Sequence, residues 1–255
     1  MLMDTHAHLC DHVFNDDRDL VLKRARDAGV GAIIAVGETL ADARTNLDLA
    51  QIFPMLKPAA GLFPTLLDLA RADAMLAFIR RHHARLFAIG EVGLDYWVVK
   101  EDGDKALQRE IFTRFIALSN ELDLPLNVHS RSAGRHAVAL LLEKGAARVQ
   151  MHAFDGKTGA ALPAVEAGYY FSIPPSILRS RQKQKLVKQL PLSALLVETD
   201  SPVLGPDAGC RNEPANLPLV VEAIASIKGT SPAAVAEVVA ENSGRLYGNR
   251  LTNGG

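Results

Sequence analysis

The sequence predicts an α/β protein that folds as one (β/α)8 barrel over residues 1–255. Three observations carry this prediction: apolar segments alternate with helical segments, eight such apolar segments occur, and no Gly-x-Gly-x-x-Gly sequence follows the first of them. Strands that are apolar throughout are typical of a parallel sheet covered on both faces. An open doubly wound sheet is the alternative, and the missing glycine fingerprint counts against it.

The expected strands are short runs at residues 4–9, 31–36, 57–62, 86–90, 126–128, 147–151, 169–172 and 195–197. Pro58 makes the third strand the weakest, because proline lacks the N–H group that a central strand donates. Segments between the strands predict helices at residues 16–28, 41–52, 68–83, 104–122, 133–143, 159–167 and 177–190. We expect Asn15 to be the N-cap of the first helix and Gly29 to end it.

The chain continues beyond the eighth strand with an irregular loop that runs to about Glu213. Two more helices are expected after it, at residues 216–227 and 232–241. Ser231 is a good N-cap for the second of these, and Pro232 suits its first helical position. No linker or low-complexity tract divides the sequence, so we expect a single domain.

The composition is that of an ordinary globular protein, with 48% hydrophobic and 22% charged residues. No segment approaches the roughly 18 uninterrupted apolar residues of a membrane span, and the start lacks a signal-peptide pattern, so we expect a cytoplasmic protein without a membrane. The formal net charge of −1 argues against extensive wrapping of duplex DNA and allows a local phosphate pocket. No feature indicates an obligate protein partner.

Six side chains with metal-ligand chemistry lie near the carboxyl ends of expected strands: His6, His8, Glu91, His129, His152 and Asp200. The first two share one face of an extended segment, since strand side chains alternate with period two. In a barrel all these strand ends meet at one rim, where active sites of the fold lie. Hydrogen-bonded rim histidines and a helix-capping Asp200 are the structural alternatives.

This set exceeds what one tetrahedral ion needs, so we expect two divalent ions, Mg²⁺, Mn²⁺ or Zn²⁺. Glu91 is the expected bridge between them, and Asp200 is expected to hold a metal or to take the proton of the attacking water. We expect both carboxylates to be catalytic. No cofactor motif or nucleophilic serine elbow competes for the chemistry.

Six motifs in series resemble the TatD family of metal-dependent hydrolases, most closely its YjjV branch. They are Asp-Thr-His-Ala-His-Leu at 4–9, Gly-Glu-Val-Gly-Leu-Asp-Tyr at 90–96, Leu-Pro-Leu-Asn-Val-His-Ser-Arg at 124–131, Met-His-Ala-Phe-Asp-Gly at 151–156, Glu-Thr-Asp-Ser-Pro at 198–202 and Arg-Asn-Glu-Pro at 211–214. Their order and spacing match along nearly the whole chain.

The resemblance implies an amidohydrolase-like TIM barrel with deoxyribonuclease or phosphodiesterase activity, often exonucleolytic from the 3′ end. It implies one metal among His6, His8, Glu91 and Asp200, and another among Glu91, His129 and His152. One departure stands out: Phe63 occupies the place of the histidine that the family usually carries in a Gly-x-His-Pro turn. Phenylalanine offers neither a metal ligand nor a hydrogen bond to phosphate.

Three further residues are expected to contact substrate. The guanidinium groups of Arg131 and Arg211 suit phosphate, with a rim salt bridge as the alternative for each. Tyr96, like its neighbour Trp97, is placed to stack on a base or to line the barrel mouth. The basic run from Arg179 to Lys188 is expected to be a solvated helix face.

The leading hypothesis is a two-metal 3′-to-5′ exonuclease that acts on single-stranded or frayed DNA, with RNA also open. The alternative is a metal-dependent hydrolase of an ester or amide, such as an aminoacyl-tRNA deacylase, because one fold supports many chemistries. A non-enzymatic binding protein is the third possibility. The sequence leaves open the metal, the polarity and mode of cleavage, and the oligomeric state.

Overall fold

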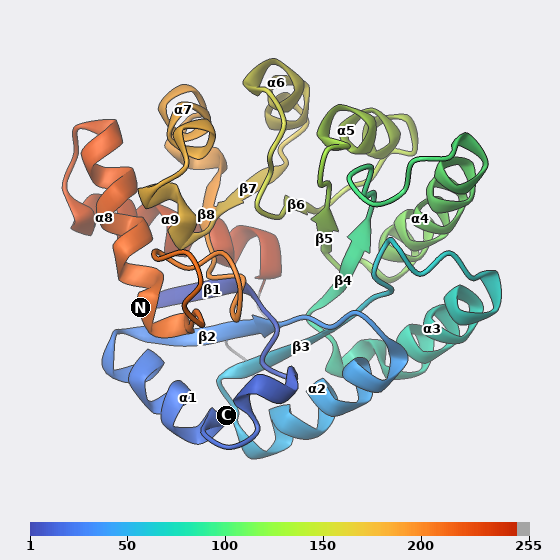
Figure 1. The fold of residues 1–255 in the computed structure, drawn as a ribbon, viewed down its shortest axis with the longest axis horizontal. Coiled ribbons are helices and arrows are strands. Elements are labelled where there is room, and N and C mark those ends of the chain that lie inside the picture. The colour runs from blue at the N-terminus through green and yellow to red at the C-terminus, as the bar shows by residue number, and fades with distance from the viewer. Residues whose placement is uncertain (249–255) are drawn as a thin grey trace.

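A computed structural model describes residues 1–248. One eight-stranded parallel sheet runs in the order β1 to β8, and helices surround it (Figure 1). The strands are β1 (Leu2–Ala7), β2 (Val30–Ala35), β3 (Leu56–Ala60), β4 (Ala88–Gly93), β5 (Leu126–His129), β6 (Val149–Met151), β7 (Tyr170–Ile173) and β8 (Leu195–Val197). The α-helices are α1 (Arg18–Asp27), α2 (Leu40–Ile52), α3 (Leu69–His82), α4 (Asp102–Leu122), α5 (Gly134–Glu143), α6 (Thr158–Glu166), α7 (Arg181–Gln189), α8 (Leu217–Lys228) and α9 (Pro232–Tyr247). The barrel prediction is confirmed.

The barrel closes where β1 meets β8 through individual hydrogen bonds. The Thr5 hydroxyl donates to the Val197 carbonyl at 3.0 Å. Backbone N–H groups of Asp200 and His8 donate to the carbonyls of His6 and Ser201, both at 2.8 Å. These bonds fix the segment after β8 against the end of β1, which carries the two N-terminal histidines.

Pro58 lies inside β3 and pairs with Ala35 of β2. Its carbonyl accepts a hydrogen bond from the Phe87 N–H on the opposite side, at 2.8 Å. A residue in a parallel strand directs its N–H and its C=O to the same neighbouring strand. The missing N–H of Pro58 therefore affects only the side toward Phe87 and leaves the pairing with β2 intact. The third strand therefore forms despite its proline.

Several boundaries differ from the sequence prediction. A 3-10 turn at His12–Phe14 precedes α1, so Asp17 rather than Asn15 stands at the N-cap position, and the predicted Asn15 cap is wrong. The helix expected at 177–190 is two pieces, because Ser180 caps a new helix by accepting from the Lys183 N–H. Ser231 does cap α9, accepting from the Ala234 N–H at 3.2 Å.

Leu, Ile, Val and Phe side chains from the outward faces of the strands pack against the helices in one large buried core. No single helix in residues 1–248 is long and apolar enough to cross a membrane; α8 with its preceding turn and α9 meet the length and composition criteria only as a pair bent by 111°. Residues 249–255 of the expected domain lie outside the described part of the chain.

Candidate metal centre

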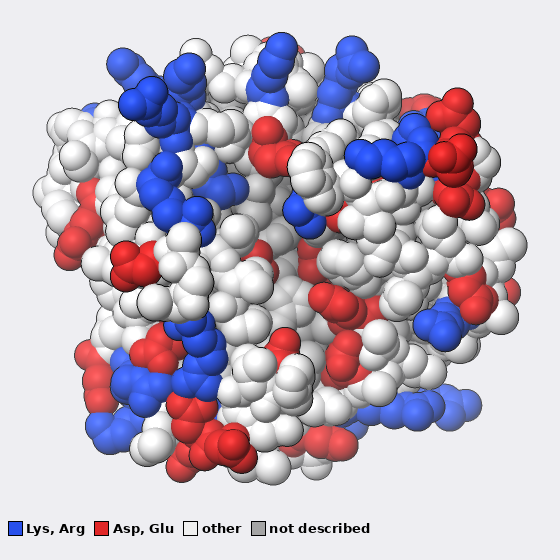
Figure 2. All heavy atoms as spheres, viewed as in Figure 1, with Lys and Arg blue, Asp and Glu red and all other residues white. Residues whose placement is uncertain are grey.

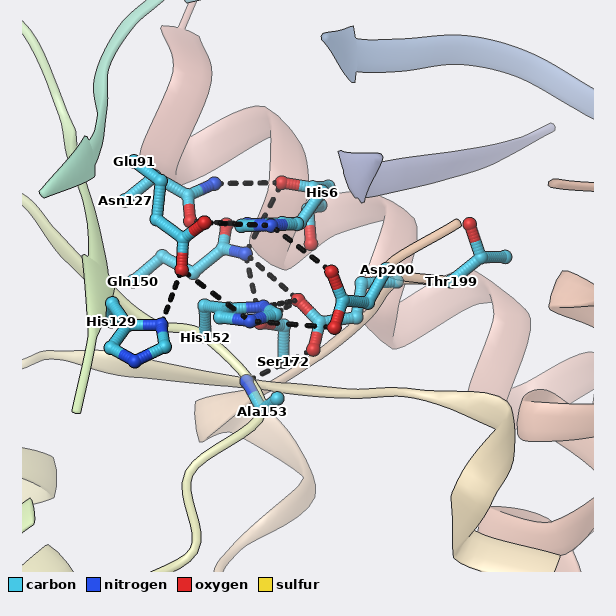
Figure 3. Close-up of polar contacts among 12 residues, drawn as sticks. His6, Glu91, Asn127, His129, Gln150, His152, Ala153, Ser172, Thr199 and Asp200 are labelled. Carbon is cyan, nitrogen blue, oxygen red and sulfur yellow. Dashed lines mark hydrogen bonds and ion pairs between the residues drawn. The ribbon is translucent and has the colours of Figure 1, made fainter. Parts of the chain in front are cut away.

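The six predicted ligand residues meet at the carboxyl end of the barrel. Figure 3 shows His6 and His152 stacked, with Glu91 and Asp200 on opposite sides of the stack. The two imidazole rings lie 3.6 Å apart between centroids at an interplanar angle of 12°. Glu91 lies inside β4 rather than just after it, because this strand runs three residues further than expected. The structure thus brings together residues that the sequence separates by up to 194 positions, between His6 and Asp200.

Four side-chain atoms form a first donor group: His6 Nε2, His8 Nε2, Glu91 Oε2 and Asp200 Oδ1. The two imidazole nitrogens are 3.2 Å apart. His6 Nε2 lies 3.8 Å from Glu91 Oε2 and 3.4 Å from Asp200 Oδ1. His8 Nε2 lies 3.4 Å from the same glutamate oxygen and 3.6 Å from the same aspartate oxygen. His6, His8 and Asp200 thus form one compact cluster, and His6 forms another with Glu91 and His152.

The spacing of the first donor group fits a bound divalent ion. Ligand atoms about 2.1 Å from a tetrahedral ion lie roughly 3.4 Å from one another. The observed separations of 3.2 to 3.8 Å surround that value. Two imidazoles and two carboxylates are also ligands that Zn²⁺ and Mn²⁺ accept.

A second donor group lies on the other side of the two carboxylates and comprises Glu91 Oε1, Asp200 Oδ2, His152 Nε2 and His129 Nδ1. His152 Nε2 is 3.9 Å from Glu91 Oε1 and 3.7 Å from Asp200 Oδ2. His129 Nδ1 is 2.6 Å from Glu91 Oε1, which is hydrogen-bonding distance. Each carboxylate thus has one oxygen near His6 and His8 and the other oxygen near His152.

Buried side chains orient three of the imidazoles by contacting the ring nitrogen that does not belong to a donor group. His6 Nδ1 lies 2.8 Å from Asn127 Oδ1, and His129 Nε2 lies 3.0 Å from Asp95 Oδ2. His152 Nδ1 lies 2.9 Å from Glu198 Oε2. Such outer partners fix the tautomer of a metal-binding histidine and make it a stronger ligand.

The sequence prediction missed these positioning residues: Asp95, Asn127 and Glu198. Each stands in one of the six motifs. Asn127 and Glu198 are two residues from a predicted ligand, and Asp95 is four residues from Glu91. The available signal was a polar side chain at or beside a strand that is otherwise apolar, since a buried polar group needs a partner.

Charge coupling dominates the protonation of the metal-free site. Burial alone lowers the pKa of His6, but its hydrogen bond to Asp200 and the charge of Glu91 raise that pKa to about 10. Burial also opposes protonation of His129, yet Glu91 and Asp95 raise its pKa to about 9. Burial would raise the pKa of Glu91, but the neighbouring histidines hold it well below its usual range. Without a metal, protons on imidazole balance the carboxylates.

Local backbone geometry places Asp200 over the barrel. Its φ is +55°, in the left-handed region, and its N–H is tied to β1. Just before it, the Thr199 N–H donates to Asp4 Oδ1 at 2.9 Å and the Thr199 hydroxyl donates to Asp4 Oδ2 at 2.5 Å. Buried Asp4 therefore holds the chain at the point where Asp200 turns inward.

Glycine is required where β4 approaches β5 beside the site. Gly93 has φ +146°, and a Cβ there would lie 2.0 Å from the His129 carbonyl oxygen. A side chain would push β5 away and displace the His129 ring from Glu91. The glycine in the Gly-Leu-Asp motif thus sets the distance between two donor-bearing strands.

The donor groups open into a cavity of about 470 Å³. Phe63 and Arg131 line it, and the Phe63 ring lies edge-on to His129 at 5.0 Å. Arg131 also lies over the Trp97 ring, 5.2 Å from its centroid.

The other two predicted substrate contacts lie elsewhere. Tyr96 packs against His136, with ring centroids 5.2 Å apart, and does not line the cavity. Arg211 donates to both carboxylate oxygens of Asp17, at 2.9 and 2.6 Å, and to the Val13 carbonyl. The rim salt bridge left open for Arg211 is the arrangement that the structure has. Cys10 and Cys210 are both free.

Fold and site together define a metal-dependent hydrolase built on a (β/α)8 barrel. The family model for TatD related DNase matches residues 3–248, so the chain belongs to the TatD family of deoxyribonucleases. Human deoxyribonuclease TATDN3 is 46% identical over 261 residues, covering 96% of this chain and 94% of that protein. The 3′-5′ ssDNA/RNA exonuclease TatD of Citrobacter rodentium is 31% identical, covering 98% and 99%. The crystal structure of the Escherichia coli TatD homolog YjjV superposes with a TM-score of 0.89 at 27% identity, covering 96% and 97%.

Proposed function

We propose that this protein is a two-metal 3′-to-5′ exonuclease that removes nucleotides from single-stranded or frayed DNA, with RNA as a possible second substrate. The observation that carries the proposal is the arrangement of Glu91 and Asp200, each with one oxygen in either donor group. Paired ions about 3.5–4 Å apart suit in-line attack on a phosphodiester. The name of the Citrobacter rodentium relative supports the polarity and the single-stranded substrate.

In this proposal His6, His8, Glu91 and Asp200 hold one ion, and Glu91, His129 and His152 hold the other. Bound Mg²⁺, Mn²⁺ or Zn²⁺ supplies a Lewis acid that makes water a better nucleophile and neutralises phosphate charge. Asp200 would accept the proton of the attacking water, since its carboxylate lines the cavity. That carboxylate is ionised, because burial raises its pKa but the charge of His152 and the hydrogen bond to His6 lower it below the usual range. Asn127, Asp95 and Glu198 keep the imidazole rings oriented.

The surface around the cavity suits a single strand. Trp97 is 59% exposed, with the Arg131 guanidinium and the Lys100 ammonium group 5.2 and 5.5 Å from its ring centroid. An exposed indole beside cations is a platform for an unstacked base. Figure 2 shows Lys and Arg side chains along the edge that α5, α6 and α7 form, while acidic side chains lie around the central hollow. The exposed basic residues on these helices include Arg135, Arg181, Lys185 and Lys188, and Lys157 directly precedes α6.

The test is hydrolysis of end-labelled single-stranded DNA by chelated protein and by protein resupplied with Mg²⁺, Mn²⁺ or Zn²⁺. We expect no activity after chelation, restored activity with metal, and mononucleotides released from the 3′ end. Asp200→Ala removes a proposed metal ligand together with the proposed base and should lower kcat by at least about a hundredfold. Asp207→Ala is the matched control, because Asp207 is an exposed aspartate in the same loop.

Activity that survives complete chelation would exclude the two-metal mechanism. Internal fragments instead of mononucleotides would replace the exonuclease by an endonuclease. Equal activity of the Asp200→Ala and Asp207→Ala variants would remove Asp200 from the chemistry.

A second candidate is hydrolysis of an ester or amide, such as aminoacyl-tRNA. Phe63 favours it, since this side chain lines the cavity beside His129 and gives that wall an apolar surface. Release of an amino acid from misacylated tRNA by metal-loaded protein that leaves DNA intact would support this candidate.

We propose that the protein is located in the cytoplasm, a prediction from the sequence that fractionation of cells would test.

A further inference from the structure

Lys183 is the one member of a basic run that points inward. Of Arg179, Arg181, Lys183, Lys185 and Lys188, it alone is buried. The buried positions of α7 are Lys183, Leu186 and Val187, and Leu190 follows them, which is the spacing of one helix face. The lysine therefore occupies a position where the helix faces the barrel, and its side chain lines the cavity of the metal centre.

The Lys183 ammonium group is incompletely paired. Its Nζ donates to the Ala153 carbonyl at 3.0 Å, directly after His152 in the chain. Among residues 1–248 no carboxylate oxygen lies within 4.0 Å of it. Burial lowers the pKa of Lys183, and the charge of Glu198 opposes that shift. An ammonium group carries three donors, so two of them are left for a ligand or water in the cavity.

A second donor lines the same cavity. Ser130 is 97% buried, with a relative exposure of 3%, and its hydroxyl has no hydrogen-bond partner among the residues described. It stands between His129 and Arg131 in the chain. An unpaired buried hydroxyl is unfavourable, so groups of this kind in a native cavity are candidates for ligand contact.

We propose that Lys183, with the Ser130 hydroxyl, forms an anion subsite that binds a non-bridging oxygen of the substrate phosphate beside the metal centre. The inference rests on the proposed phosphodiester chemistry. A buried cation without an ion-pair partner favours an anionic ligand, and a phosphate oxygen accepts a charge-assisted hydrogen bond.

The test measures binding of inorganic phosphate to the Mn²⁺-loaded protein by calorimetry. The variants are Lys183→Met, which removes the charge at similar volume, Lys183→Gln, which keeps a hydrogen-bond donor, and Lys183→Arg, which keeps the charge. Lys185→Met is the matched control, because Lys185 is exposed on the same helix and lines no part of this cavity. Metal content and melting temperature are recorded for every variant.

We expect phosphate affinity to fall about tenfold or more in the Met and Gln variants, and to stay within about threefold of wild type in the Arg and Lys185→Met variants. Ser130→Ala should weaken phosphate binding by about three- to tenfold. Unchanged phosphate affinity in folded, metal-loaded Met or Gln variants would overturn the inference and leave Lys183 as an anchor for the Ala153 carbonyl. If the Met variant fails to fold, the Gln variant decides the outcome.

The DNA assay keeps this inference separate from the proposed function. Phosphate binding that depends on Lys183 in a protein that cleaves no DNA would retain the anion subsite and discard the nuclease. A nuclease whose Lys183→Gln variant binds phosphate and cleaves DNA as wild type does would retain the proposed function and discard the subsite.

Discussion

His152 Nδ1 lies 2.9 Å from Oε2 of Glu198, a fully buried carboxylate that accepts four hydrogen bonds. The other donors are the Ala153 N–H at 2.9 Å, the Ser172 hydroxyl at 2.6 Å and, more weakly, the Gln150 amide at 3.5 Å. An acceptor at this place keeps the proton on Nδ1 and leaves Nε2 free to bind a metal. Glu198 thus determines which nitrogen His152 presents to the second donor group.

Replacing Glu198 by Gln should weaken metal binding without changing the fold. The amide nitrogen of glutamine would face either the Ala153 N–H or the three donors on the other side, which are His152, Ser172 and Gln150. At least one donor therefore loses its acceptor. We expect metal affinity to fall about 10–100-fold and stability to fall by about 1–3 kcal/mol. Metal content after dialysis against a weak chelator and urea denaturation measure the two effects.

Glu222→Gln is the control for this variant, since Glu222 is exposed on α8, far from β6 in the chain. If the Glu198→Gln protein binds metal as tightly as this control does, His152 keeps its proton on Nδ1 without the carboxylate.

The metal-free protein should lose stability as the pH rises. Folding raises the pKa of His6 from 6.5 to about 10 and that of His129 from 6.5 to about 9. Between pH 6.5 and these higher values, the folded state binds more protons than the unfolded state. The stability that comes from protonating His6 and His129 is therefore complete below pH 6.5 and is lost as the pH rises past about 9 and about 10. Glu91 acts at the other end: its lowered pKa contributes stability above 4.5 that is lost at lower pH.

Metal binding must displace these protons, so metal affinity should increase by up to about tenfold per pH unit for each proton released. Urea denaturation of chelated and Mn²⁺-loaded protein from pH 6 to 10 tests both statements. A chelated protein that is equally stable across this range would show that the histidines are neutral in the folded state.

The main features of the fold were predictable because the parallel strands are short and apolar. The candidate ligands were predictable because His6, His8, His129 and His152 stand within one residue of a strand end and Asp200 three residues beyond one. Strand ends of a barrel share one rim. Glu91 lies among the other candidate ligands although β4 runs on to Gly93, since its direction into the barrel does not depend on where the strand stops.

The features that the sequence did not predict depend on three-dimensional packing. The 3-10 turn at His12–Phe14 displaced the start of α1, and a local side-chain cap at Ser180 divided the seventh helix. Arg211 was a plausible phosphate contact until its partner was known, because Asp17 lies 194 residues away in the chain. Lys183 was hidden in a basic run, although its spacing from Leu186, Val187 and Leu190 carried the signal of a buried face.

The two arginines from the sequence prediction should now separate in function. Arg131 lines the cavity, whereas Arg211 is paired with Asp17 at the rim. We expect Arg131→Ala to raise KM for single-stranded DNA about tenfold through loss of a charge-assisted contact. Arg211→Ala should leave KM unchanged and reduce stability by no more than about 1 kcal/mol, since the ion pair is partly exposed.

Each variant removes one positive charge, so steady-state kinetics and thermal unfolding of the pair control for net charge. A similar rise in KM for both variants would indicate that the overall positive charge of the protein, and not a direct contact of Arg131, determines the KM for single-stranded DNA. A rise in KM for Arg211→Ala alone would mean that its ion pair opens to receive the substrate.

Phe63 gives the final prediction, because it brings an apolar ring where a hydrogen-bond donor would reach phosphate. Its ring lies 5.0 Å from the His129 ring, and both side chains line the cavity. Phe63→His should keep the metal content and lower KM for single-stranded DNA about three- to tenfold, since a neutral imidazole adds a donor worth about 0.5–1.5 kcal/mol. Phe63→Leu is the control, because it changes the shape of the cavity wall without adding a donor. A larger gain for Leu than for His would show that the ring of Phe63 limits substrate entry, whereas a loss of activity in both variants would show that the aromatic ring itself contacts the substrate.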